Sequence, residues 1–101
     1  MRYGTPYGFF ELNPFPGCNQ LVISNHSWIH PKHRGQGIGS EEHLNRLGEI
    51  ERLGYDCAIC TVKSDNIAQI KILEKFGWTY CYKFNNRETG NEVLIYARSM
   101  A

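Results

Sequence analysis

Apolar residues gather in two short segments near the start of the chain, at positions 7–12 and 20–30. Aromatic and β-branched residues are frequent in both segments, which predicts two strands. Asparagine, proline and glycine at positions 13–17 mark a turn between them. Pro31 ends the second segment, because proline has no amide hydrogen with which to extend a sheet. We expect these two strands to form a hairpin.

Two helices are predicted further along the chain. From position 40 to position 53 apolar residues recur at every third position with charged residues between them, which indicates an amphipathic helix that ends before Gly54. The apolar stripe of this helix is Leu44, Leu47, Ile50 and Leu53. Capping side chains at 64–66 precede a second helix over 67–76, and Gly77 marks its end.

The rest of the chain predicts three more strands. The segment 55–62 is short and almost continuously apolar, as in a central strand that is covered on both faces. Two final strands are predicted at 78–84 and 92–98, joined by a polar loop. The order is β-β-α-β-α-β-β, an α/β (α+β) fold with two helices and a mixed, mostly antiparallel sheet of about five strands. The strands at 20–30 and 55–62 can lie side by side and parallel, because a helix connects them.

Length and composition limit the classes of protein that fit this pattern. The chain has 101 residues, of which 42% are hydrophobic and 21% charged, so we expect one folded domain over residues 1–101. Its 11 basic and 10 acidic residues give a net charge of +1, which disfavours nucleic acid as a partner. The sequence has no long apolar segment and no secretory signal, so the expectation is a cytoplasmic protein without a membrane partner.

The chain has four cysteines, which could form disulfides, a redox site or a metal site: Cys18, Cys57, Cys60 and Cys81. Cys57 and Cys60 have the spacing of a redox or zinc motif, but they lie inside a predicted strand. No second pair of cysteines lies at the spacing of a metal site. We therefore expect reduced thiols and no metal.

Candidate chemistry is concentrated in the loop that follows the second strand. Residues 34–39 read Arg-Gly-Gln-Gly-Ile-Gly and lie between a predicted strand and a predicted helix. Such a loop offers free amides at the positive end of the helix dipole. Glycines at 35, 37 and 39 can adopt positive φ and let the backbone approach phosphate oxygens closely. The spacing matches neither a P-loop nor a dinucleotide fingerprint, so the pattern alone indicates a pyrophosphate site or a tight turn.

Two blocks of sequence give this loop a family context. The block 29–40 resembles the signature of the GNAT N-acetyltransferases, an apolar residue, proline two positions later, then Arg/Gln-x-x-Gly-x-Gly/Ala. The block 66–78 begins with Asn66, closes on Lys-Phe-Gly-Trp, and is similar to the family's downstream helix. The chain resembles a short member of this family over residues 18–99, one without the usual N-terminal strand and helices. The resemblance implies a GNAT-like fold.

The resemblance also implies where acetyl-CoA, or coenzyme A, would bind. It would lie in the gap between the strands at 20–30 and 55–62, with the pyrophosphate on the amides of residues 36–40. Backbone groups near Trp28 would pair with the pantetheine arm, and Asn66 would contact the pantetheine or the acetyl end. The cofactor-binding residues expected on this basis are Trp28, Ile29, Arg34, Gly35, Gln36, Gly37, Ile38, Gly39, Ser40 and Asn66.

The implied reaction is direct transfer of an acetyl group to an amine in a ternary complex, which needs a base and a means of neutralising the CoA thiolate. His26 and His30, on the strand that enters the gap, are the candidate catalytic residues, as general bases. The family's acid is commonly a tyrosine at the position where this chain has Leu73. Either the thiolate leaves without an acid or a tyrosine of a neighbouring strand substitutes: Tyr80, Tyr82 or Tyr96.

The only indication of the acceptor's chemical class is the short N-terminal part, in which 17 residues precede Cys18. An open acceptor side favours a protein or peptide amine over an enclosed small metabolite, unless a second copy completes the site in a homodimer. The alternative is a non-catalytic, CoA-binding regulatory or interaction protein on the same fold, which the departure at Leu73 favours. Nucleic-acid binding through Lys32 and Arg34 is disfavoured by the near-neutral charge.

Overall fold

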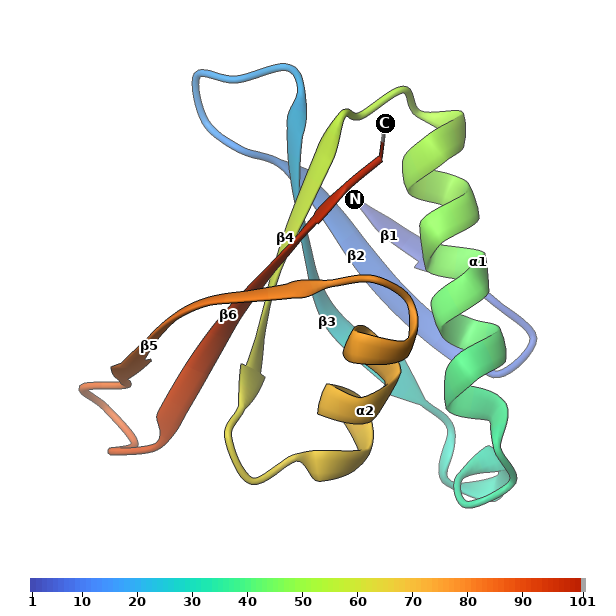
Figure 1. Ribbon diagram of the computed structural model, residues 1–101. Helices are drawn as coiled ribbons and strands as arrows, with labels where there is room; N and C mark the ends of the chain where they lie inside the picture. The colour runs from blue at the N-terminus through green and yellow to red at the C-terminus, as the bar shows by residue number, and fades with distance from the viewer. Residues whose placement is uncertain (101) are drawn as a thin grey trace.

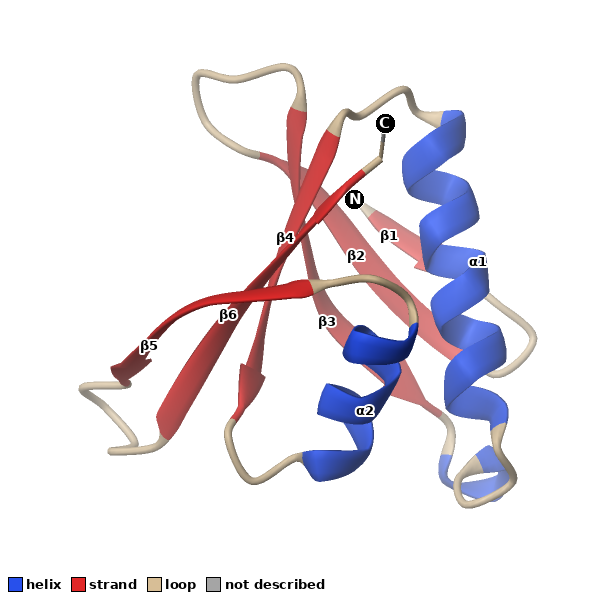
Figure 2. Cartoon of the chain, viewed as in Figure 1, coloured by secondary structure: helices blue, strands red, loops and turns tan. Residues whose placement is uncertain are grey.

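Within the described residues, six strands form one mixed sheet in the order β1-β2-β3-β4-β6-β5, and two α-helices connect its strands (Figures 1 and 2). The structure is a computed structural model that describes residues 1–100, except for the side chain of residue 26. The strands are β1 Arg2–Gly4, β2 Gly8–Pro14, β3 Leu21–Ile29, β4 Cys57–Lys63, β5 Thr79–Asn85 and β6 Glu92–Ser99. The helices are α1 Ile38–Arg52, α2 Ile67–Lys75 and the 3-10 turn η1 Pro31–His33.

The predicted mixed α+β fold is confirmed, and the structure adds one strand, β1, to the five that were expected. This strand has three residues, too few for an alternating pattern to be visible in the sequence. It pairs antiparallel with β2, so that Arg2 lies opposite Glu11.

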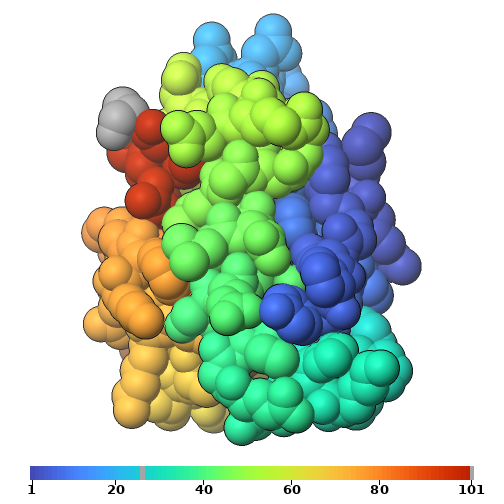
Figure 3. All heavy atoms as spheres, turned by 90° about the vertical axis from the view of Figure 1, so that its right-hand side faces the viewer, coloured from blue at the N-terminus to red at the C-terminus, as the bar shows by residue number. Residues whose placement is uncertain are grey.

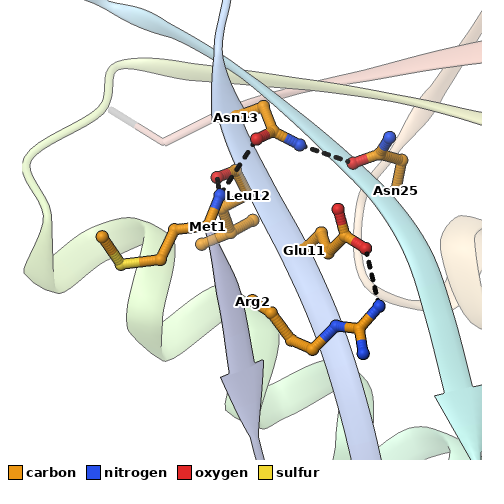
Figure 4. A network of polar contacts seen from close by, with 6 residues as sticks. All are labelled: Met1, Arg2, Glu11, Leu12, Asn13 and Asn25. Carbon is orange, nitrogen blue, oxygen red and sulfur yellow. Dashed lines mark hydrogen bonds and ion pairs between the residues drawn. The ribbon is translucent and has the colours of Figure 1, made fainter.

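Figure 4 shows the polar contacts that attach the start of the chain to β2. The amino group of Met1 donates to the carbonyl of Leu12 at 2.8 Å and to Asn13 Oδ1 at 3.0 Å. The Asn13 amide donates in turn to Asn25 Oδ1 of β3 at 3.2 Å. These bonds join three neighbouring strands on one edge of the sheet.

The strands β3 and β4 are parallel, as predicted, and α1 connects them. Every other pair of neighbouring strands is antiparallel. Both helices pack on one face of the sheet (Figure 1). Ile50 of α1 and Leu73 of α2 are fully buried there with Val22 of β3 and Ala58 of β4. The core thus holds both helices in place next to the β3–β4 pair.

The buried face of α1 differs from the predicted one. Leu47 and Ile50 are buried, but Leu44 is 55% exposed and Leu53 is 39% exposed. A step of three residues falls short of a full helical turn of 3.6, so a stripe at every third position drifts around the helix and leaves the core. Three polar residues of α1 are buried instead: Glu42, His43 and Arg46.

Candidate functional site

The site begins where β3 and β4 separate. The two strands pair only at three positions, from Leu21 opposite Cys57 to Ile23 opposite Ile59. Beyond that point β3 continues alongside β2, and β4 continues alongside β6. The facing edges of the two strands therefore carry backbone amides and carbonyls that no ladder pairs, and such groups need another partner.

An irregularity in β3 lies beside this gap. Phe9 of β2 is opposite Trp28, whereas Glu11 is opposite Asn25, so β3 contains one residue more than β2 between the two pairs. This is a β-bulge, which increases the local twist and bends the strand that carries the extra residue. The bulge follows the last paired position of β3 with β4, and bends β3 in the segment where the two strands part.

A cleft of about 970 Å³ occupies the gap. One wall is β3 and the loop that follows it, the opposite wall is the second half of β4, and the starts of α1 and α2 border it. Its lining residues are Ser24, Asn25, Ser27, Trp28, Ile29, His33, Arg34, Gly35, Gly37, Ile38, Gly39, Arg46, Cys60, Thr61, Val62, Lys63, Asn66, Ala68, Gln69 and Ile72.

The glycine loop lies at the N-terminal end of α1 (Figure 3). Gly35 and Gly37 have φ of 76° and 74°, in the left-handed region where a side chain is strained. Gly37 is the N-cap residue of α1, and no side chain caps this end of the helix. The first amides of α1 are therefore open to a ligand in the cleft, which a carboxylate or phosphate suits best.

Gly39 does not adopt the positive φ that the sequence pattern suggested for it. It lies inside α1, and the structure does not give it a positive φ. A Cβ at this position would lie 2.8 Å from Ile72 Cδ1, so Gly39 allows α1 and α2 to approach each other closely. The sequence pattern could not separate this packing role from the role of Gly35 and Gly37.

Side chains of the loop hold it to the end of β3. Arg34 Nε donates to the carbonyl of Ile29 at 2.7 Å, and the Gln36 amide donates to the carbonyl of Lys32 at 3.0 Å. The Arg34 guanidinium also lies over the Trp28 ring, 5.8 Å from its centroid. Arg34 thus connects β3 to the glycine loop. Its partner, the Ile29 carbonyl, is one of the backbone groups that were predicted to pair with the pantetheine arm.

Most of the predicted cofactor-binding residues come together in the cleft. Two are not part of its lining, Gln36 and Ser40. Eight line it: Trp28, Ile29, Arg34, Gly35, Gly37, Ile38, Gly39 and Asn66.

Asn66 lines the cleft from the start of α2. Its side-chain Oδ1 accepts a hydrogen bond from the amide of Gln69 at 3.2 Å, so it caps α2. Any contact with a ligand must then come from the Nδ2 group, which is a donor.

Of the two candidate bases, the structure describes the side chain of His30 and not that of His26. His30 is exposed and is not part of the cleft lining. Its Nδ1 accepts from the amide of Lys32 at 3.3 Å, which caps the turn η1. The side chain of His26 lies outside the described residues, so its role stays a prediction. His33, which was not predicted as a base, lines the cleft and lies edge-on to Tyr7.

None of the candidate acids reaches the cleft. Leu73 is fully buried in the core. Tyr80 and Tyr82 are exposed on the edge strand β5. Tyr96 is buried on the neighbouring strand β6, and burial is the main cause that raises the pKa of its hydroxyl. In the part of the chain that the structure describes, no tyrosine lines the cleft.

Three buried residues with a polar or thiol group at the cleft were missed by sequence reasoning: Ser24, Arg46 and Cys60. Burial raises the pKa of the Cys60 thiol to about 12, so this thiol stays protonated at neutral pH. Burial also lowers the pKa of the Arg46 guanidinium. Arg46 looked like part of the exposed face of an amphipathic helix, and no local signal distinguishes it from Glu49 or Arg52.

No three His, Cys, Asp or Glu side chains among the described residues converge as they would around a metal ion. No helix in the same part of the chain has the length and apolar character needed to cross a membrane.

Comparison with known proteins places this site in a family. The model of the acetyltransferase (GNAT) family matches residues 2–78. The L-methionine sulfoximine/L-methionine sulfone acetyltransferase of Salmonella typhimurium is 26% identical over 76 residues, which make up 74% of this chain and 44% of that protein.

Two solved structures illustrate the likeness of fold. One is yncA of Salmonella typhimurium, a candidate acetyltransferase with its cofactor acetyl-CoA, with a TM-score of 0.79, 19% identity, and coverage of 94% of this chain and 58% of that one. The other is the ribosomal-protein-S18-alanine N-acetyltransferase of Escherichia coli, with a TM-score of 0.74, 19% identity, and coverage of 92% and 62%.

The chain thus spans between 44% and 62% of the length of these three proteins. The family model nevertheless includes β1 to α2, the divergence of β3 and β4, and the glycine loop. The predicted recognition is confirmed, and the chain belongs to the GNAT acetyltransferase family, whose cofactor is acetyl-CoA.

Proposed function

We propose that this chain binds acetyl-CoA in the β3–β4 cleft and transfers its acetyl group to an amine. The observation that carries the proposal is the divergence of two parallel strands directly beside a glycine loop that starts a helix. The divergence supplies unpaired backbone groups for an extended, amide-containing ligand, and the helix start supplies amides for an anion. Acetyl-CoA has both features, and it is the family's cofactor.

The pyrophosphate would occupy the cleft at the start of α1. Gly35 and Gly37 line the cleft there, and a Cβ on either would extend into open space. The phosphate oxygens would accept from the uncapped amides that follow Gly37. Lys32 and Arg34 add positive charge to the same loop, which favours an anion further.

The pantetheine arm would extend from this loop between the strands. Its amide groups would pair with the backbone edges of β3 and β4, and Asn66 Nδ2 would donate from the start of α2. The acceptor amine must lose a proton before it attacks the thioester, and His26 remains the predicted base. Backbone amides at the gap would polarise the thioester carbonyl, which is the usual means of stabilising the oxyanion in acyl transfer.

The acceptor is proposed to be a protein or peptide amine. Its side of the cleft includes the half-exposed Trp28 and the exposed Lys63. Among the similar proteins, one acts on small amino-acid derivatives and another on a ribosomal protein, so the family context allows both classes. The exposed rim supports the larger acceptor.

A second candidate function is CoA binding without turnover, in a regulatory or interaction protein. The observation that favours it is Leu73, which replaces the family's tyrosine with a side chain that is fully buried. In that case acetyl-CoA binds and no acceptor becomes modified.

Intact-mass spectrometry separates the two functions. The chain is incubated with acetyl-CoA and with lysine peptides, free N-terminal peptides or small amino acids, and binding of CoA is measured in parallel by calorimetry. Acetylated peptides support the proposed function. Binding of CoA with no modified acceptor supports the second function, and absence of CoA binding contradicts both.

A further inference from the structure

Arg46 lies at the inner end of the cleft. Its side chain is 5% exposed, and it lines the cleft together with Ser24 of β3 and Cys60 of β4. At a rise of 1.5 Å per residue, Arg46 is about 10 Å from Gly39 along the axis of α1. It is therefore well removed from the glycine loop, and its charge interacts with Cys60, the residue that follows the last position of β4 paired with β3.

One nitrogen of the buried Arg46 guanidinium lacks a hydrogen-bond partner among the described residues. This nitrogen is Nε, and Ser24 Oγ lacks a partner among these residues as well. Glu42, one turn earlier on α1, is 3% exposed, and both of its carboxylate oxygens are also unpartnered, so the two side chains are not bonded to each other. Burial removes the guanidinium from water, and the charge of Glu42 acts on it without a hydrogen bond, so a negative group that enters the cleft and accepts from Arg46 would be stabilised.

The proposed function supplies such a group. When the pyrophosphate occupies the glycine loop, the thioester end of the cofactor extends toward the opposite, inner end of the cleft. Resting on the proposed function, we propose that Arg46 stabilises the CoA thiolate that leaves when the acetyl group is transferred. The ligand class of this site is thus a thiolate, a soft anion formed only during the reaction.

The step balances without a protein acid. The amine nitrogen forms a bond to the acyl carbon and gives up its proton to the base. The carbon–sulfur bond breaks, and its electron pair stays on sulfur. Arg46 donates a hydrogen bond to that sulfur and keeps its own proton, since guanidinium is not deprotonated in proteins. The thiolate takes a proton from water after release.

Among the described residues that line the cleft, Arg46 is the group left to stabilise the thiolate. Leu73 is buried in the core, and no tyrosine of the described residues lines the cleft. The Cys60 thiol, whose pKa is raised by burial, remains neutral and does not compete as an anion. A fixed charge aimed at the place where negative charge develops is worth most in a site that excludes water.

The test is the pH dependence of two affinities. CoA carries a thiol that can ionise, and S-methyl-CoA does not. If Arg46 stabilises the thiolate, the affinity for CoA rises relative to that for S-methyl-CoA by about tenfold or more between about pH 6 and about pH 10, because each unit of lowered thiol pKa is a factor of ten. Among the described residues, the protein groups that interact with Arg46 are Glu42 and His43 on α1 and Cys60 on β4, and any effect that they have on the binding of both ligands cancels from the ratio.

Three variants complete the experiment. In Arg46→Gln the ratio of affinities stays flat with pH, and in Arg46→Lys, which keeps the charge, much of the rise returns. Glu42→Gln, the matched control on the same helix, keeps or increases the rise, because it removes a competing negative charge. With acetyl-CoA, Arg46→Gln lowers kcat by at least about tenfold and leaves KM nearly unchanged, since the thioester is uncharged.

Each outcome is decisive. If the wild-type chain binds both ligands and their ratio does not change with pH, the role of Arg46 is refuted while the CoA site stands. The same holds if Arg46→Gln folds and shows the wild-type rise. If the chain binds neither ligand, the proposed function itself fails. If Arg46→Gln does not fold, the pH dependence of the affinity ratio in the wild-type chain, compared with that in Arg46→Lys and Glu42→Gln, still tests the role of Arg46.

Discussion

Gly37 combines a left-handed backbone with open space at the mouth of the cleft. The sequence pattern predicted this position as part of a phosphate cradle, and the structure gives it φ of 74° and no heavy atom within 4 Å of an added Cβ. The strain of a side chain there is roughly 1 kcal/mol, whether or not a ligand binds. A control must therefore separate backbone strain from loss of the ligand site.

Gly37→Ala is expected to weaken CoA binding by at least about tenfold, because the Cβ enters the space of the pyrophosphate. Gly54→Ala is the matched control. Gly54 has φ of 81°, an equally open surrounding, and a position at the far end of α1. Both variants should lose similar stability in urea unfolding, and only Gly37→Ala should lose affinity in calorimetry. Equal affinities for CoA would contradict the assignment of the loop.

His43 makes the stability of the chain depend on pH. It is 1% exposed, its Nε2 accepts from Trp78 Nε1 at 2.8 Å, and its ring stacks on Phe76. Burial, aided by the charges of Arg46 and Arg98, lowers the pKa of His43 to about 3. The unfolded chain binds the proton at its ordinary pKa near 6.5.

The pKa of His43 is lower in the folded protein than in the unfolded chain. Protonation of His43 therefore costs no stability above about pH 6.5, and the free energy of unfolding falls as the pH drops from there toward about 3. At about pH 5 the loss is roughly 2 kcal/mol. In His43→Gln, which retains an acceptor for Trp78, this part of the loss should disappear. Urea unfolding of both proteins at about pH 7 and about pH 5 checks the difference, and an equal loss in both would exclude His43 as its source.

At the scale of elements, the contact between α1 and α2 sets one border of the cleft. Gly39 of α1 faces Ile72 of α2, and both line the cleft. Gly39→Val should lower the free energy of unfolding by about 1–3 kcal/mol, because the extra atoms force the helices apart. Gly48→Ala, at a helical glycine with open surroundings, should instead raise it by about 0.5–1 kcal/mol. Chemical unfolding that shows equal stabilities would contradict the close approach of the helices.

Sequence reasoning located five of the six described strands, both α-helices and the glycine loop, and was insufficient for the interior of the site. Apolar runs and turn residues locate strands and helices, because those signals are local. The β-bulge beside Trp28 and the divergence after Ile23 depend on pairing between distant segments, which no local pattern encodes. Glu42, His43 and Arg46 look like ordinary polar positions of a helix, and only packing against the sheet shows that they are buried.

At the scale of the whole molecule, the sheet consists of two three-stranded halves. The first is β1-β2-β3 and the second is β4-β6-β5, and only three residue pairs join them in the sheet. A ligand in the cleft would contact both halves, and should therefore stabilise the entire fold. At a concentration of CoA about 100 times its dissociation constant, unfolding should cost about 2.7 kcal/mol more. An unfolding midpoint that does not respond to CoA would contradict binding across the two halves.

The central claim is that acetyl-CoA lies between β3 and β4 with its pyrophosphate at the start of α1. Hydrogen exchange of backbone amides, measured with and without CoA, tests it most directly. We predict slower exchange at residues 27–29, at residues 35–40 and in the second half of β4, and no change in the loop between β5 and β6. Protection confined to other segments, or no protection at saturating CoA, would contradict the account.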